Sequence, residues 1–451
     1  MDSQNKHIRR RFKMWHGIVS LLLVLFILFH VTGRLKLKKQ LNVLRAKGYP
    51  VTLEELYNWY NIPAGVENSA DVYMDAFSNY VEWDREALKA LPIVGRAPLP
   101  ARTQPLDDPN HQLVEKFLSD NKETLTLLHE AASIDHCRYP IGFIQESDQD
   151  APWLKNLRKC ARLLRLNVLI QCESKNSEKA MKSIHSTLSL AKSSNVPLLI
   201  HRLVHIAVKA TAYKNMERLL NRIQLTEEQL MKLSSWIEEV GNDEGYKRTL
   251  IGENCIGLHS FRGHVREVSD RLGSEGGLSI IFLAFLRVTG LNDRDATQYI
   301  DIMQELIDAM ELSADERLLV FDSIQKDVDS GKRGGMLTRM LMPAFGRIMQ
   351  IETRHLAHLL VTQTALTVER YRLTEGHLPE SLENLVPAYM EVVPKDPFDG
   401  LNLKYRTLET GFVVYSVGYD LTDEGGAERD SQKRDQRGKP LPWDITFIVE
   451  R

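Results

Sequence analysis

The chain has little cysteine. Its four cysteines are spread over 451 residues, at Cys137, Cys160, Cys172 and Cys255, and set no disulfide framework in a chain of this length. Cys160 and Cys172 fall in one predicted helix, where twelve residues at about 1.5 Å rise each separate them by roughly 18 Å. That distance is beyond the reach of a disulfide. We therefore expect buried thiols.

Motifs of common catalytic and nucleotide-binding sites are also missing. The sequence contains no GxGxxG fingerprint, no GxSxG elbow, no HExxH motif and no paired CxxC. The loop at Gly331 and Lys332 lacks the upstream glycine and the following Ser or Thr of a phosphate-binding loop. Because no nucleophile, base and orienting group can be assembled from the sequence, we expect a protein without a catalytic role.

Net charge is nearly absent, but it is unevenly distributed. The chain carries −2 overall, while residues 1–47 hold eleven Lys or Arg and one acidic residue. The rest of the chain is therefore mildly acidic. This argues against nucleic-acid binding, which requires a basic face to displace counterions. The basic residues lie on both sides of an apolar stretch, a pattern that indicates a membrane instead.

That apolar stretch covers residues 17–33 and contains no formally charged residue. At about 1.5 Å per residue it spans roughly 25 Å, slightly less than the ~30 Å hydrocarbon core. Trp15 and the flanking basic residues can reach the interfaces and make up the difference. The segment after it lacks the small residues of a signal-peptide cleavage site. The sequence predicts an uncleaved, single-pass anchor.

The side on which the body lies is open to two interpretations. Five Lys or Arg precede the anchor and six follow it closely, so the positive-inside rule barely decides. A short N-terminus before one anchor favours a body outside the cytoplasm. Alternatively, Leu37, Leu41 and Leu44 share one helical face among basic residues, as in a cytoplasmic helix that lies on anionic lipid.

The region after residue 47 has an overwhelmingly helical pattern. Three helices are expected at 153–173, 177–193 and 197–220, joined by short polar turns. Small residues at three- and four-residue spacing allow close helix packing, as in a repeat-like array of helical hairpins. The apolar run 278–288 is too short to span a bilayer. It predicts a buried core helix, with a membrane-dipping segment as the alternative.

A long helix, predicted at 343–374, joins this body to a C-terminal α+β module. The expected domains are residues 1–47, 48–335 and 336–451. The expected fold is mainly α, with a transmembrane helix at the N-terminus and a short antiparallel meander near the C-terminus.

Two groups of side chains have metal-ligand spacing. His201 and His205 are one helical turn apart, and Glu352, His355 and His358 follow at spacings of three. The second group matches half of a carboxylate-bridged di-metal site, but no second copy is present. We expect buried or bundle-facing polar residues at both places, and a metal-dependent hydrolase is the alternative.

The last eighty residues contain a distinctive order of motifs: Glu375–Pro379 at a helix end, the turn Pro394–Gly400, and the strand Tyr415–Gly418 followed by acidic residues. Over about Thr362–Val449 this order resembles the C-terminal module of the major pseudopilins of type II secretion. No prepilin cleavage motif is present, so the resemblance does not extend to the N-terminus. The layout of anchor, helical body and tail looks like uncharacterised families of bacterial membrane-anchored envelope proteins.

The resemblance implies a calcium site in the loop that follows the Tyr-Ser-x-Gly strand. The candidate ligands are Asp420, Asp423 and Asp444, and Glu424, Asp430 and Asp435 lie in the same segment. Ca²⁺ takes six to eight oxygen ligands from carboxylates and backbone carbonyls, which a flexible acidic loop can supply. The alternative is a solvated charged loop.

These observations predict a membrane-anchored scaffold or interaction protein of the bacterial cell envelope, connected with secretion and binding protein partners. Its expected location is the inner membrane, with the body on the periplasmic side. A metal-dependent hydrolase and a calcium-stabilised, pseudopilin-like structural component are the alternatives.

Overall fold

The computed structural model describes residues 2–62, 65–141, 143, 152–241, 244–263, 284–342, 345–429 and 442–451. The chain is mainly helical, with one three-stranded antiparallel sheet and one apolar N-terminal helix, which confirms the predicted fold class at this level. It divides into two compact units. Unit 1 consists of Met1–Trp59, Ile251–Ala309 and Asp322–Phe345, and unit 2 of Tyr60–Leu250, Met310–Phe321 and Gly346–Arg451.

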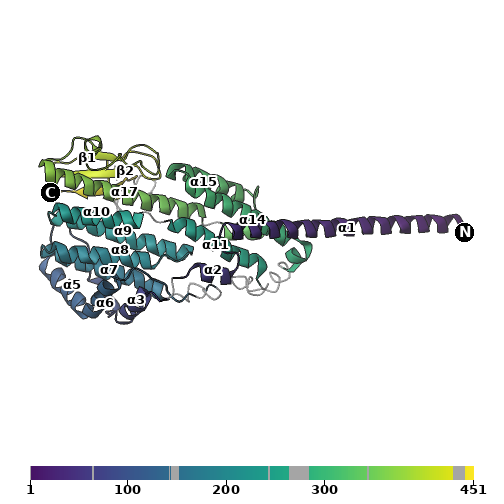
Figure 1. The fold of residues 1–451 in the computed structure, drawn as a ribbon, viewed down its shortest axis with the longest axis horizontal. Coiled ribbons are helices and arrows are strands. Elements are labelled where there is room, and N and C mark those ends of the chain that lie inside the picture. The colour runs from purple at the N-terminus through teal and green to yellow at the C-terminus, as the bar shows by residue number, and fades with distance from the viewer. Residues whose placement is uncertain are drawn as a thin grey trace. The chain divides into compact units, whose positions relative to one another are not determined.

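Unit 1 is built around the packing of α1 (Asp2–Ala46) on α14 (Leu291–Asp308) (Figure 1). The other helices with residues in this unit are α2 (Leu53–Trp59), α11 (Gly245–Arg262), α15 (Ala314–Asp329) and α16 (Met336–Leu341). The basic residues of α1 face the acidic residues of α14. Arg34 lies 3.6 Å from Asp293, and Lys36 lies 3.7 Å from Asp301. Exposed pairs of this kind add little stability each, but they fix the register of the two helices.

The start of α16 is held by a buried carboxylate. Asp295 accepts hydrogen bonds from the backbone N–H of Gly335 at 2.8 Å and of Leu337 at 2.9 Å. The first N–H groups of a helix have no partner within the helix, so an acidic side chain satisfies both the donors and the positive end of the helix dipole.

Unit 2 contains the three regularly spaced helices that the sequence predicts: α7 (Pro152–Glu173), α8 (Ser177–Ser193) and α9 (Leu199–Arg222), each of which packs on the other two. The Asn176 side chain caps α8 by accepting from the N–H of Lys179 at 3.1 Å. The remaining elements of this unit are α3 (Ser69–Ser78), α4 (Arg85–Lys89), α5 (Asp108–Asp120), α6 (Lys122–Ala131), α10 (Glu227–Gly241), η1 (Ala309–Glu311), α17 (Phe345–Glu375) and η2 (Leu382–Leu385).

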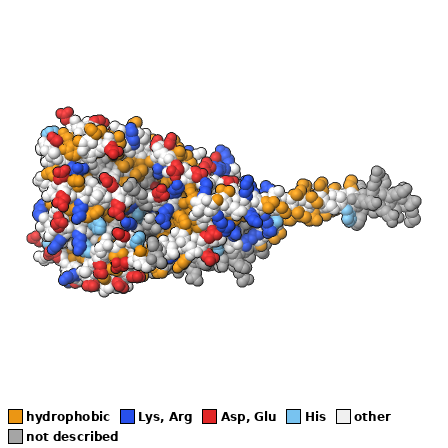
Figure 2. Space-filling model, in the orientation of Figure 1, with side chains coloured by type: hydrophobic (Ala, Val, Ile, Leu, Met, Phe, Trp, Pro, Cys, Tyr) orange, Lys and Arg blue, Asp and Glu red, His pale blue; other side chains and the backbone are white. Residues whose placement is uncertain are grey.

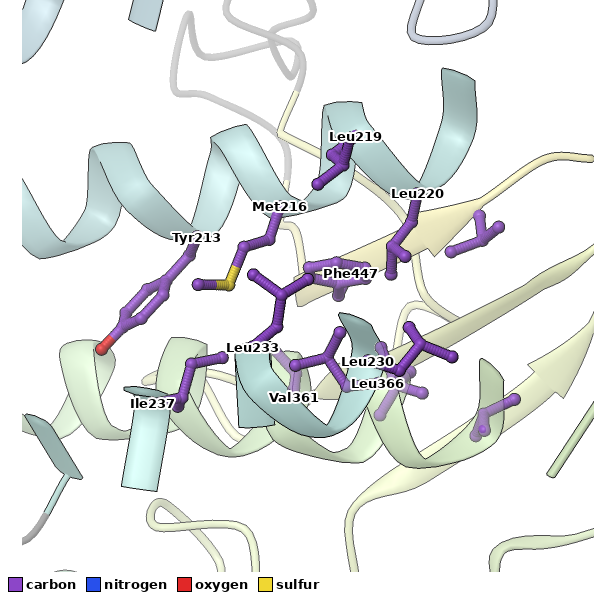
Figure 3. Packing of buried hydrophobic residues seen from close by; sticks show 14 of the residues in the cluster. Tyr213, Met216, Leu219, Leu220, Leu230, Leu233, Ile237, Val361, Leu366 and Phe447 are labelled. Atoms are coloured by element: carbon purple, nitrogen blue, oxygen red, sulfur yellow. The ribbon is translucent and has the colours of Figure 1, made fainter. Parts of the chain in front are cut away.

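The core of unit 2 joins the helices to the sheet. Met216 from α9, Leu233 from α10 and Leu366 from α17 converge with Phe447 of the sheet (Figure 3). All four side chains are almost fully buried. Burial of a large apolar side chain stabilises a fold by roughly 1.5–3 kcal/mol, so this cluster binds the C-terminal module to the helical part of the unit.

The predicted meander is present. Its strands are β1 (Lys404–Thr407), β2 (Phe412–Ser416) and β3 (Ile445–Val449), paired antiparallel in the order β1-β2-β3. The turn before them is fixed by Asp396, whose carboxylate accepts from the Ser416 hydroxyl and the Val417 N–H, both at 2.9 Å. The turn is thereby tied to the end of β2.

Side chains of α9 satisfy the edge of β3 that the sheet leaves unpaired. The N–H of Ile448 donates to Glu217 at 2.9 Å, and the Asn221 amide donates to the Ile448 carbonyl at 2.7 Å. Asn221 also accepts from the N–H of Glu450 at 2.8 Å. An exposed strand edge is open to pairing with other chains, so these bonds close it against the helical body.

Candidate functional site

The first candidate site is the exposed apolar part of α1. From Met14 to Val31 nearly every side chain is apolar, and all but two of those described are open to solvent (Figure 2). The helix is long and apolar enough to cross a membrane, with a mean hydropathy of 2.2 over its most apolar window. Contiguous apolar surface of this size marks contact with lipid or protein.

The apolar part ends where α14 begins. The Arg294 guanidinium lies 3.7 Å from the centre of the Phe29 ring, and the backbone of Gly290 packs against His30. Gly290 has a φ of +74°, and a Cβ atom at this position would press into the His30 ring. Glycine is therefore required where the two helices meet, and Phe29 and His30 are the first half-buried residues of α1.

Leu37, Leu41 and Leu44 do not form a lipid-facing surface. All three are buried, Leu44 to 1% exposure, within the part of α1 that packs along α14. The interpretation of this face as a helix lying on cytoplasmic lipid is wrong, because the leucines belong to a protein core. They carry no information about the side of the membrane on which the body lies.

The predicted core helix at 278–288 is confirmed only in part. Residues 278–283 lie outside the described residues; residues 284–288 are helical, and Leu286 is buried, but Phe285 is 55% and Val288 70% exposed. Leu291, at the start of α14, is exposed as well. These three apolar side chains flank Gly290, the residue that packs on His30. An exposed apolar edge therefore lies beside the end of the apolar part of α1.

The second candidate site is the acidic loop after β2. Asp444 is 1% exposed, and its Oδ2 accepts from the N–H of Gly426 at 2.7 Å and of Ala427 at 3.3 Å. Its Oδ1 is buried and, among the described residues, accepts no hydrogen bond from an N–H or hydroxyl group, while the carboxyl of Glu424 lies within hydrogen-bonding reach of Asp444. Oε2 of Glu424 is likewise buried and accepts no hydrogen bond from an N–H or hydroxyl group of the described residues. Burial, with the charges on Asp420 and Asp444, raises the pKa of Glu424 to about 7.

The other predicted ligand points elsewhere. Asp423 forms an ion pair with Lys404 at 3.2 Å and accepts from the N–H of Gly425 at 2.9 Å. Glu424 lies near both Asp420 and Asp444, and the charge on Asp423 also acts on Asp444. Asp430 and Asp435 lie outside the described residues.

A calcium ion at this loop would need backbone oxygens. Within the described ranges, no group of three or more His, Cys, Asp or Glu side chains is arranged to hold a metal ion. Two inward oxygens, Oδ1 of Asp444 and Oε2 of Glu424, nevertheless accept no hydrogen bond from an N–H or hydroxyl group of these ranges. Buried carboxylate oxygens are normally hydrogen-bonded. This pair fits a hard cation completed by carbonyl groups, or a proton shared between the two acids.

The second predicted metal group, on α17, is occupied by an ion pair. Glu352 and Arg202 form a bidentate pair, with Nε to Oε1 at 2.6 Å and a second bond at 3.0 Å. His355 stacks on Tyr213, with ring centres 5.7 Å apart. Burial, and then the charges on Lys209 and Arg202, hold the pKa of His355 well below its usual value. Burial likewise lowers the pKa of His358, to about 4.

His201 and His205 are also core residues. The His201 ring lies 5.1 Å from Trp153, and neither of its nitrogens has a hydrogen-bond partner. Its burial lowers its pKa to about 3, so the ring is neutral. Nδ1 of His205 is bonded to the Ala191 carbonyl at 2.7 Å, which ties α9 to α8. These contacts are those of packed side chains.

Comparison of the chain with protein-family models, with curated proteins and with solved structures finds no match.

Proposed function

We propose that the chain is a single-pass membrane protein of the bacterial cell envelope that acts as a scaffold for protein partners. The observation that supports this most is the exposed apolar surface of α1 between Met14 and Val31. Its described part covers about 27 Å of helix at 1.5 Å per residue, close to the ~30 Å hydrocarbon core. Burial in lipid removes this surface from water.

In this proposal unit 1 touches the membrane at a second place. Phe285, Val288 and Leu291 insert among the lipid headgroups beside the anchor, and Arg34, whose side chain is 70% exposed, meets the phosphates. Apolar residues ringed by cations are the usual composition of an interfacial segment. We therefore keep the alternative that the run 278–288 dips into the membrane, for its described residues 284–288.

The scaffold role rests on the succession α7, α8 and α9, which we propose forms a helical-hairpin array. Arrays of this kind present extended surfaces to partners. The pseudopilin-like interpretation of residues 362–449 rests on the motifs and on the meander that they build, and it suggests a secretion-related partner. We propose that the body lies on the periplasmic side, as the pseudopilin-like interpretation of its C-terminal module suggests.

Two measurements test this role. Protease added to intact spheroplasts should digest the body, whereas digestion only after lysis would place it in the cytoplasm. Chain solubilised from its native membranes should migrate as a complex with a reproducible partner, and chain expressed alone should migrate as the 51.7 kDa protein in its detergent belt. Identical migration of the two samples would remove the scaffold role.

A calcium-stabilised C-terminal module is a second proposal, carried by the buried oxygens of Glu424 and Asp444. Calcium that binds only the folded module raises its melting temperature by mass action. We expect a chelator to lower the melting temperature of the full chain in detergent, and Asp444→Asn to abolish this response. Asp315→Asn, in an acidic residue outside the loop, is the matched control. A chelator response that persists in Asp444→Asn would rule out this site.

A further inference from the structure

A solvent-open cavity of about 350 Å³ lies in unit 2 against α7 and α9. Residues 99–102 form another side of it. Small-molecule sites commonly have volumes of about 300–1,000 Å³, so this cavity has room for a small ligand. Its charged lining residues are Arg102, Arg165, Lys214, Glu217, Arg218 and Glu428.

Both acidic residues of the lining are paired with one cation. Arg102 forms ion pairs with Glu217, at 3.3 Å, and with Glu428. Glu217 also accepts from the N–H of Ile448. Arg218 points to backbone oxygens, with bonds of 2.7 Å to the carbonyls of Ala101 and Gln104. Arg102, Glu217 and Glu428 therefore neutralise one another, and Arg218 is bonded to the backbone, although its buried Nε has no hydrogen-bond partner among the described residues.

The other two charged lining residues are Arg165 and Lys214, which take no part in these pairs. Within the part of the chain that the structure describes, neither forms a hydrogen bond or a close ion pair, and the only favourable charge acting on both is that of the Glu217 carboxylate, which Arg102 already pairs. Arg165 is half-buried in the cavity wall, and Lys214 reaches solvent. A guanidinium that is partly removed from water gains from an oxyanion partner, which it can bind through two parallel N–H groups.

Further positive charge surrounds this pair. The charge on Arg429 lowers the pKa of both Lys214 and Arg354, and the charge on Arg354 lowers the pKa of His358. Partial burial, followed by the charge on Arg165, lowers the pKa of Lys214. Like charges held together repel one another, and a bound anion relieves this repulsion.

The rest of the lining is mostly apolar, with Ile93, Leu99, Val168 and Leu169, and includes the polar Asn215. A ligand that suits both the cationic pair and the apolar lining carries a compact anionic group on a small carbon skeleton. We propose that this cavity binds a phosphate monoester, with Arg165 and Lys214 as the phosphate ligands and the apolar wall against the attached carbon atoms. The anion has two possible sources, a soluble metabolite or a lipid headgroup with a phosphate monoester, such as phosphatidic acid.

The test uses the full chain in a neutral detergent, with thermal stability and calorimetric titration as readouts. The probes are glycerol 3-phosphate, short-chain phosphatidic acid, and sodium chloride at matched ionic strength. Arg165→Gln and Lys214→Gln are the test variants. Arg158→Gln is the control, because Arg158 is an exposed arginine two turns earlier on the same helix.

We expect a phosphate probe to bind saturably to the wild type and to Arg158→Gln. In each test variant the affinity should fall about tenfold or more, because a charge-assisted hydrogen bond is lost. Binding of glycerol 3-phosphate points to a soluble ligand, and binding of phosphatidic acid alone to a lipid. Stabilisation equal to that by chloride, or equal affinities of wild type and both test variants, would overturn the proposal. Because the site does not involve α1, its failure leaves the membrane proposal untouched.

Discussion

Replacement of Glu352 by glutamine distinguishes a structural ion pair from a metal ligand. Arg202 is 5% and Glu352 7% exposed, and two bonds of 2.6 and 3.0 Å join them. Removing one partner of such a pair leaves the other charge buried without compensation, which costs about 3–5 kcal/mol. Glu352→Gln keeps the shape of the side chain, so the loss is electrostatic and not a packing defect.

Replacing both partners should restore most of this stability. Arg202→Met with Glu352→Leu removes both charges together, and exchanging a buried ion pair for apolar residues is often neutral or stabilising. The expected result is a non-additive cycle, in which the double variant is more stable than either single variant.

The assay is urea unfolding of the full chain in detergent, followed by circular dichroism and combined with elemental analysis of the folded protein. The account expects a lower unfolding midpoint for Glu352→Gln and no change in metal content. Unchanged stability together with loss of a stoichiometric metal would refute it and would restore the hydrolase alternative at Glu352, His355 and His358.

Three further predictions follow from single positions. Gly411→Ala should lower the free energy of unfolding, measured in urea, by more than about 2 kcal/mol, because φ is +93° and the new Cβ would overlap the Val449 carbonyl. The control Gly376→Ala has φ of +76° but open space around it, so it should cost only about 1–2 kcal/mol. Equal losses in the two variants would disprove the clash. Leu44→Glu should unfold unit 1 at lower temperature, since it buries a charge, and an unchanged melting curve with weaker lipid binding would revive the lipid-facing interpretation. Without calcium, the free energy of unfolding should decrease as pH rises from about 4.5 to 7, because the raised pKa of Glu424 makes the folded chain hold a proton that the unfolded chain has already lost. A dependence of the unfolding free energy on pH that is unchanged in Glu424→Gln would contradict this.

The elements with strong local signals are the ones that the sequence predicts well. The apolar spacing that predicts α7, α8 and α9 is a local property of the sequence, and so is the order of motifs that predicts the meander. The apolar helix near the N-terminus is equally local, because a run of apolar residues needs no partner to be recognised.

Predictions failed where burial depends on a distant segment. The leucines of α1 from Leu37 to Leu44 have the spacing of a lipid-facing helix and that of a core helix, and only the position of α14 decides between them. The run ending at Val288 was predicted to be buried from composition alone; of its described residues Leu286 is buried and Phe285 and Val288 are exposed, because composition carries no information on what covers each side chain.

The candidate sites depend on contacts that are remote in sequence. Arg202 and Glu352 are 150 positions apart, so the spacing of Glu352 and His355 suggested a metal where an ion pair exists. Glu424 was recognised as an acidic loop residue, but its approach to Asp444 requires the fold of the loop onto β3. The unpaired state of Arg165 becomes visible only when the partners of its neighbours are known.

The central claim is that the apolar part of α1 lies in a bilayer, and extraction of membranes with alkaline carbonate tests it most directly. Untagged wild-type chain should remain in the pellet and dissolve only with detergent. Leu25→Arg should move a substantial fraction to the supernatant, because arginine near the bilayer centre costs about 2.5–3.5 kcal/mol. Leu35→Arg, at an exposed position beyond the apolar stretch, should stay in the pellet. Recovery of the wild-type chain in the detergent-free supernatant would contradict the account.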